Sequence, residues 1–142
     1  MDNLEPGAYM ILPVGAEDRD FSIGLLPTVA DASVPVVALA TQRVWTVDIL
    51  AGNPGGYTLS LDGLYAHEDG ESGVIADMLP PGQPWRIRQV GDGSVTIERA
   101  LPEQVPRAWI LPELSSGTQV LMSRIANEPD RNQRWRFVAG KS

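Results

Sequence analysis

Two short motifs alternate three times along this chain, and they limit what it can fold into more than any other feature. The first motif is Gly-x-apolar-x-apolar, and its copies begin at Gly7, Gly55 and Gly93. The second motif is a tryptophan that follows a glutamine by two or three residues, and its copies are Trp45, Trp85 and Trp135. Units that repeat in this way cannot each bury an apolar face alone. The repeats therefore predict three similar units packed around a common centre.

Glycine and proline divide the chain into short segments. The 14 glycines and 12 prolines are spread along all 142 residues, which leaves no room for long helices. Several segments between them alternate polar with apolar residues, as in Tyr57–Leu61, and this period of two is typical of β-strands. Each unit has room for two more strands between its glycine motif and its tryptophan. The sequence thus predicts four strands per unit and twelve in all.

The expected strands form one all-β domain over residues 1–142, with three pseudo-repeats. In the first unit, residues 1–52, the expected strands are Ala8–Leu12, Phe21–Leu26, Val34–Leu39 and Val44–Leu50. In the second unit, residues 53–91, they are Tyr57–Leu61, Leu64–His67, Val74–Leu79 and Trp85–Val90. In the third unit, residues 92–142, they are Val95–Arg99, Ala108–Leu111, Gln119–Arg124 and Trp135–Val138.

The same alternation predicts which side chains are buried. The four tryptophans lie inside alternating strands and are expected in the core rather than in a sugar-stacking set. Four arginines alternate with core residues and are expected on a solvated outer face, namely Arg86, Arg88, Arg134 and Arg136.

Charge and residue usage exclude several classes of function. The chain has 11 basic and 18 acidic residues, a net charge of −7, which argues against nucleic acid as a partner. The charge is uneven, because residues 1–80 hold two cations and twelve acids whereas residues 81–142 hold nine cations and six acids. With no cysteine and one histidine, disulfides and metal sites built on cysteine or on several histidines are excluded.

The remaining sequence features predict neither membrane contact nor catalysis. No apolar run approaches the roughly 18 residues of a membrane span, and the N-terminus lacks the pattern of a secretory signal. A cytoplasmic protein is therefore expected. The acidic stretch His67–Ser72 fits no cation-binding loop and is expected to be a solvated turn. No catalytic motif, metal site or cofactor site is predicted.

The tryptophan motifs resemble those of a known fold. Gln83-Pro84-Trp85 and Gln133-Arg134-Trp135 resemble the Gln-x-Trp motif of ricin-B-like β-trefoils, and Gln42–Trp45 is a looser copy. More closely, several segments resemble the cysteine-free mushroom serine protease inhibitors, relatives of the mycocypins. These segments are Leu4–Ile11, Val44–Val47 leading to Gly56–Leu59, Trp109–Leu111 and Asn132–Phe137. The resemblance covers essentially the whole chain.

This resemblance implies a β-trefoil of fungal origin that inhibits a serine protease and is not an enzyme. The expected partner is a trypsin-like protease, bound by substrate-like insertion of a rigid exposed loop, and the inhibitor is expected to be a monomer. The best candidate loop contains Ser123, Arg124, Ile125, Ala126 and Asn127. Arg124 is expected to be the specificity residue, because its planar guanidinium pairs at two points with the carboxylate in a trypsin-like pocket.

Other loops compete as the reactive site. Arg19 lies in the loop Gly15–Asp20 among acids, which would repel the acidic entrance of a trypsin-like pocket. Arg107 ends the proline-bracketed loop Pro102–Arg107. The loop Pro27–Ser33 has no basic residue, so it would favour a chymotrypsin-like or elastase-like target.

Two other classes of binding protein stay open. A carbohydrate-binding trefoil is the main alternative, and Asn132–Trp135 is its best support. Asp18, Asp62 and the segment Gly63–Tyr65 are only weak fits to an early aspartate with a stacking aromatic. The third class is an inhibitor of cysteine proteases, against which the short connection Ala40–Arg43 argues.

Overall fold

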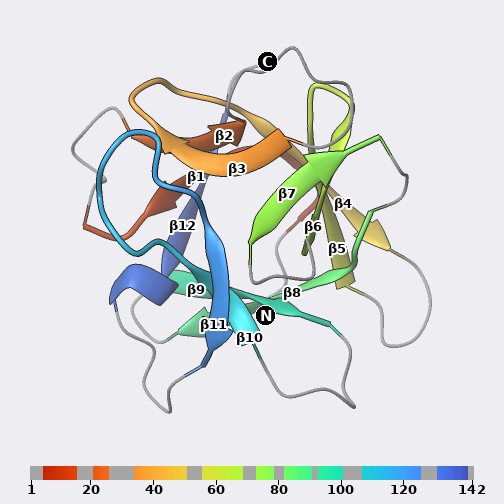
Figure 1. Ribbon diagram of the computed structural model, residues 1–142. Coiled ribbons are helices and arrows are strands. Elements are labelled where there is room, and N and C mark those ends of the chain that lie inside the picture. The colour runs from red at the N-terminus through yellow and green to blue at the C-terminus, as the bar shows by residue number, and fades with distance from the viewer. Residues whose placement is uncertain are drawn as a thin grey trace.

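The computed structural model describes nine segments of the chain. They are residues 5–15, 21–25, 34–50, 56–68, 73–78, 82–90, 93–100, 107–125 and 131–140. These residues form twelve strands of one sheet and a 3-10 turn (Figure 1). Within the described segments, no helix is long and apolar enough to cross a bilayer.

The strands follow the three sequence units. The first unit contains β1 (Gly7–Pro13), β2 (Ser22–Leu25), β3 (Val34–Leu39) and β4 (Trp45–Leu50). The second contains β5 (Gly56–Leu61), β6 (Leu64–Glu68), β7 (Val74–Asp77) and β8 (Trp85–Val90). The third contains β9 (Ser94–Arg99), β10 (Arg107–Ile110), β11 (Leu121–Arg124), the 3-10 turn η1 (Arg131–Gln133) and β12 (Trp135–Ala139). All twelve expected strands are confirmed, and their ends differ from expectation by at most two residues.

Six of the strands close into a barrel, namely β1, β4, β5, β8, β9 and β12. The barrel register repeats in each unit, because the apolar residue of the glycine motif lies opposite the tryptophan of the same unit. The opposed pairs are Tyr9 and Trp45, Tyr57 and Trp85, and Val95 and Trp135. This common register confirms the predicted threefold pseudo-symmetry.

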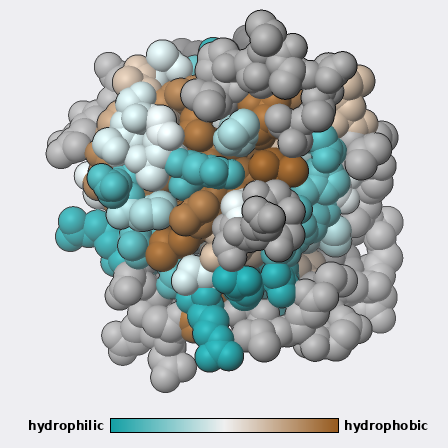
Figure 2. All heavy atoms as spheres, viewed as in Figure 1, coloured by the Kyte–Doolittle hydropathy of each residue, from teal (hydrophilic) through white to brown (hydrophobic). Residues whose placement is uncertain are grey.

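The hairpins β2–β3, β6–β7 and β10–β11 meet in a cap, in which β3, β7 and β11 surround the centre of the view (Figure 1). The Val120 N–H donates to the Val36 carbonyl at 2.8 Å, and the Val74 N–H donates to the Val120 carbonyl at 2.9 Å. The segment before β11 therefore bonds to the other two hairpins, which explains why β11 begins later than expected. Figure 2 shows that hydrophilic and apolar residues are mixed on this face.

The four tryptophans fill the core, as predicted, and each is fully buried. Trp109 meets Trp85 edge to face at 5.5 Å and Trp135 at 5.9 Å between ring centroids. Each barrel tryptophan donates its indole N–H to a carbonyl of the first cap strand of its own unit. These bonds join Trp45 to Ile23 (2.8 Å), Trp85 to Ala66 (3.3 Å) and Trp135 to Trp109 (3.4 Å). Ile23, Ala66 and Trp109 are thus equivalent positions.

The outward arginines divide into two groups. Arg86 and Arg88 are exposed as expected, although the Arg88 Nε also pairs with the buried Glu98 carboxylate at 2.7 Å. The expectation of full solvation is wrong for Arg134 and Arg136, which are half-buried. They precede or lie within β12, which is hydrogen-bonded on both sides, to β1 and to β9, so neighbouring strands cover part of each side chain.

Candidate functional site

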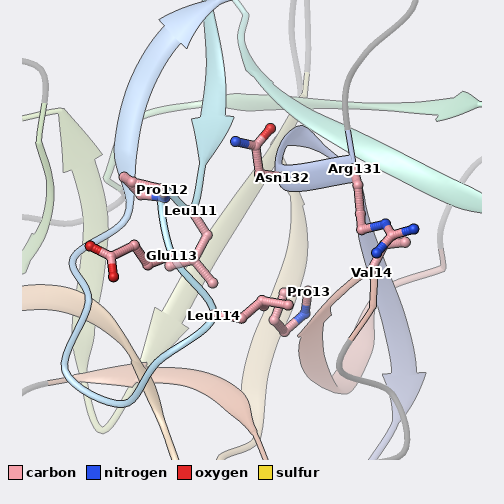
Figure 3. A pocket seen from close by; sticks show the side chains of 8 residues that line it. All are labelled: Pro13, Val14, Leu111, Pro112, Glu113, Leu114, Arg131 and Asn132. Carbon is pink, nitrogen blue, oxygen red and sulfur yellow. The ribbon is translucent and has the colours of Figure 1, made fainter.

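A cavity of about 330 Å³ lies where the first and third units meet. Its walls come from three segments far apart in sequence (Figure 3). They are Pro13 and Val14 at the end of β1, Leu111–Leu114 after β10, and Arg131 and Asn132 in η1. A pocket of this size is suited to a small molecule.

Main-chain hydrogen bonds hold the three wall segments together. The Leu111 N–H donates to the Asn132 carbonyl at 2.9 Å, which joins the loop after β10 to η1. The Val14 N–H donates to the Arg134 carbonyl at 3.1 Å, which joins the end of β1 to the start of β12. Because these bonds fix the walls before a ligand arrives, binding would cost little free energy for ordering the site.

The cavity combines an apolar wall with a polar rim. Pro13 and Leu111 are buried in its wall, and Leu114 points toward Pro13 (Figure 3). Arg131 lies beside Val14 and Asn132 beside Leu111 (Figure 3), and both polar residues are exposed. A guanidinium offers only donors, whereas an asparagine amide offers donors and an acceptor. The arrangement suits a ligand that has an apolar face and several hydroxyl groups.

The absence of a side chain at Gly15 leaves room for the Arg131 side chain beside the cavity. Its φ is +101°, a left-handed conformation that glycine adopts without strain. A Cβ at Gly15 would lie only 3.1 Å from the Cδ of Arg131. The arginine side chain therefore packs across the glycine backbone.

The expected reactive segment is only partly within the described residues. Ser123 and Arg124 are the last two residues of β11, and Ile125 follows them. Ala126 and Asn127 lie outside the described segments. The Arg124 side chain is exposed, and its carbonyl accepts a hydrogen bond of 2.8 Å from the Gln133 Nε2. A protease that received Arg124 as its specificity residue would have to replace this bond with the donors of its oxyanion hole.

The structure brings two competing candidates together. Arg107, the first residue of β10, lies directly opposite Arg124 on β11. Sequence reasoning treated them as separate loops, because no local pattern reports the register between two strands. Arg19 and the loop 27–33 lie outside the described part of the chain.

The acidic stretch that begins at His67 is not simply a solvated turn. His67 and Glu68 belong to β6, and their side chains are 21% and 19% exposed. The His67 Nε2 lies 2.8 Å from an oxygen of Asp77 on β7. The expected strand Leu64–His67 is confirmed and extends to Glu68, so the expectation of a solvated turn is wrong for these two residues. Residues 69–72 lie outside the described segments. Among the described residues, no group of three or more potential ligands could hold a metal ion.

The residues expected to support sugar binding lie in different places in the structure. Asn132 lines the cavity, whereas Gln133 is buried and holds the Arg124 carbonyl. Asp62 lies in the exposed turn between β5 and β6, with a φ of 55°. Asp18 falls outside the described residues. The cavity itself was missed, because its walls come together only in the folded chain.

Comparison with known proteins identifies the fold. No protein-family model and no curated protein matches the sequence, so the resemblance to mushroom protease inhibitors has no such support. The structure is similar to the Rhizoctonia solani agglutinin, with a TM-score of 0.77, 18% identity and coverage of 97% of this chain and 98% of that one. The chain is a β-trefoil. Identities this low show the fold alone.

Two further solved structures have the same fold. ThreeFoil, a designed 3-fold symmetric protein, gives a TM-score of 0.73 at 18% identity, over 94% of this chain and 99% of that one. SeviL, whose structure is bound to the asialo-GM1 saccharide, gives a TM-score of 0.67 at 12% identity, over 96% of this chain and 100% of that one.

The β-trefoil repeat allows the cavity to be compared with the equivalent place between the second and third units. The tryptophan bonds and the barrel register make Glu68 equivalent to Leu111, and Arg99 equivalent to Pro13. Arg99 pairs there with Glu68 through two contacts, one of them Nε to Oε2 at 3.0 Å. The Gln83 Nε2 donates to the same carboxylate at 2.8 Å. The ion pair of Glu68 and Arg99 thus lies between the second and third units. At the equivalent place between the third and first units, the apolar residues Leu111 and Pro13 line the cavity.

Proposed function

We propose that this β-trefoil binds carbohydrate, and that the cavity between its first and third units is the binding site. The observation that carries the proposal is the rigid cavity itself, with Pro13 and Leu111 in its wall and Arg131 and Asn132 at its rim. Similar folds include an agglutinin and a protein whose structure is bound to a saccharide. In this proposal the protein is a binding protein and not an enzyme.

The chemistry of the cavity fits a sugar ring. The apolar C–H face of the ring would pack on Leu114, the exposed leucine of the lining, while the buried Leu111 would support the wall behind it. Neighbouring hydroxyls would accept from the Arg131 guanidinium and exchange hydrogen bonds with the Asn132 amide. The lining residues include no aromatic ring, so affinity would depend on these polar contacts more than on stacking.

A glycan array followed by calorimetry with the best ligand tests the proposal. We expect Arg131→Ala and Asn132→Ala each to weaken binding about tenfold, since each removes hydrogen bonds to the ligand. Arg86→Ala is the matched control, because Arg86 is an exposed arginine on β8 and does not line the cavity. An array without any binding, or a ligand that both cavity variants bind as tightly as wild type, would reject the proposal.

Inhibition of a trypsin-like protease is a second proposal, and one observation favours it. Arg124 is exposed at the end of an ordered strand, with its backbone held by Gln133, so the side chain is presented on a rigid support. The test is titration of trypsin, chymotrypsin, elastase, subtilisin and papain with wild type and Arg124→Ala. Trypsin inhibition that disappears in the variant supports this proposal, and uninhibited trypsin rejects it.

A further inference from the structure

Two arginines face each other across the third cap hairpin. Strands β10 and β11 lie side by side (Figure 1). Arg107 on β10 and Arg124 on β11 are register partners in this antiparallel pair, as are Trp109 and Met122. Directly opposed residues have Cα atoms about 4.5–5.5 Å apart, and like charges at such positions destabilise a sheet. The Arg107 Nη2 donates to the Met122 carbonyl at 3.2 Å, which holds this side chain along β11. Two arginine side chains therefore leave the same face of the sheet at one end of the hairpin.

The fold does not require charge at this place, as the other two units show. Arg107 lies two residues before Trp109, which is equivalent to Ile23 and Ala66. The residue at the same place is Phe21 in the first unit and Leu64 in the second. When the strand register is extended by one residue, Ala40 falls opposite Phe21 and Met78 opposite Leu64. These two positions are equivalent to Arg124 in the third unit. Neither of these two equivalent pairs carries a charge.

We infer that Arg107 and Arg124 together bind an anionic group, a sulfate or a carboxylate, carried by an acidic saccharide. An oxyanion held by both side chains, on the face of the sheet from which they project, would offset the repulsion between the arginines. It would also accept several charge-assisted hydrogen bonds, because each planar guanidinium can engage two oxygens at once. That the anion belongs to a saccharide rests on the proposed function.

The arginine pair and part of the cavity wall both lie in the third unit. Leu111 in the cavity wall is four residues beyond Arg107, a distance of about 13 Å along a strand. From the other side, Gln133 binds the Arg124 carbonyl and directly follows Asn132 of the cavity rim. In this inference an oligosaccharide of more than one ring would place one ring in the cavity and an acidic substituent at the arginines.

Because the protein is negatively charged overall, an acidic saccharide would be attracted only by the two arginines at short range. The chain carries −7 overall, so a polyanion gains nothing from long-range attraction. Nine of the eleven cations lie in residues 81–142, which include both arginines. We expect binding of the acidic saccharide to weaken as ionic strength rises, because both arginines lie at the protein surface.

The test compares a sulfated galacto-oligosaccharide with its chemically desulfated form, and both with inorganic sulfate, by calorimetry at low ionic strength. We expect the sulfated form to bind about tenfold more tightly than the desulfated form, and Arg107→Gln or Arg124→Gln to abolish this difference. Arg86→Gln is the control, since it changes the net charge equally and should leave the difference intact. Sulfate should raise the melting temperature of wild type but not of Arg124→Gln, which checks the site in the folded protein.

The outcomes separate this inference from the proposed function. If both forms bind equally and Arg131→Ala weakens both, the arginine site is refuted and the cavity stands. If sulfate and the sulfated form bind through the arginines while Arg131→Ala and Asn132→Ala change nothing, the arginine site stands and the cavity is refuted. Equal losses in Arg86→Gln and Arg124→Gln would show unspecific charge attraction and would overturn the inference.

Discussion

The indole Nε1 of Trp45 donates a hydrogen bond of 2.8 Å to the carbonyl oxygen of Ile23, and this contact joins the barrel to its cap. Both residues are fully buried, so neither group can turn to water instead. The same bond recurs in the other units at 3.3 Å and 3.4 Å. The repeated tryptophan therefore fills the core and also satisfies one carbonyl of each cap hairpin.

Trp45→Phe is expected to destabilise the protein by about 2–4 kcal/mol, because it leaves the Ile23 carbonyl unsatisfied and removes buried ring volume. Urea unfolding measures the loss. Trp135→Phe is the matched variant, since its bond to Trp109 is longer at 3.4 Å, and we expect it to cost less. Equal costs for the two variants would show that lost volume, and not the hydrogen bond, determines the effect.

Trp109 should tolerate replacement by phenylalanine better than the barrel tryptophans do. Its Nε1 is buried and finds no acceptor among the described residues, so Trp109→Phe removes a donor that contributes no hydrogen bond. We expect a loss below about 1.5 kcal/mol, with the edge-to-face contact to Trp85 retained. Near-ultraviolet circular dichroism should change strongly, because the contacts among three tryptophans are altered. A loss as large as that of Trp45→Phe would contradict this account.

The ion pair between Glu68 and Arg99 should show strong coupling in a double-mutant cycle. Both side chains are mostly buried, at 19% and 14% exposure, so Arg99→Met leaves a carboxylate with poor compensation and should cost about 2–4 kcal/mol. The double variant Glu68→Met with Arg99→Met should lose less than the two single variants added together. Additive losses in chemical denaturation would mean that the two charges do not stabilise each other.

Gly15→Ala should impair both stability and ligand binding. The left-handed φ disfavours any Cβ, and the contact at 3.1 Å would displace Arg131 from the cavity. Gly117→Ala is the matched control, because its φ is +92° and nothing lies within 4 Å of the added Cβ. We expect each variant to lose about 1–2 kcal/mol. Only Gly15→Ala should weaken binding of the glycan that the array selects, and equal binding losses would disprove the role given to Arg131.

Sequence patterns predicted most of the fold but only fragments of the site. Period-two alternation between glycine and proline breaks located all twelve strands, because side-chain direction within a strand is a local property. The same alternation placed the tryptophans in the core. It ended the sixth strand at His67, one residue early, because the acidic residues that follow suggested a turn although strand pairing with β7 continues through Glu68.

The sequence by itself determined the repeat, the strand pattern and the buried tryptophans, since each of these depends on residues close together in the chain. Only the tertiary structure decided that Arg107 lies opposite Arg124, that Pro13 meets the loop after β10, and that Glu68 pairs with Arg99. These relationships depend on strand register and on the closure of the barrel. A local pattern specifies which face a side chain takes, whereas its distant neighbour is fixed only when the whole sheet closes.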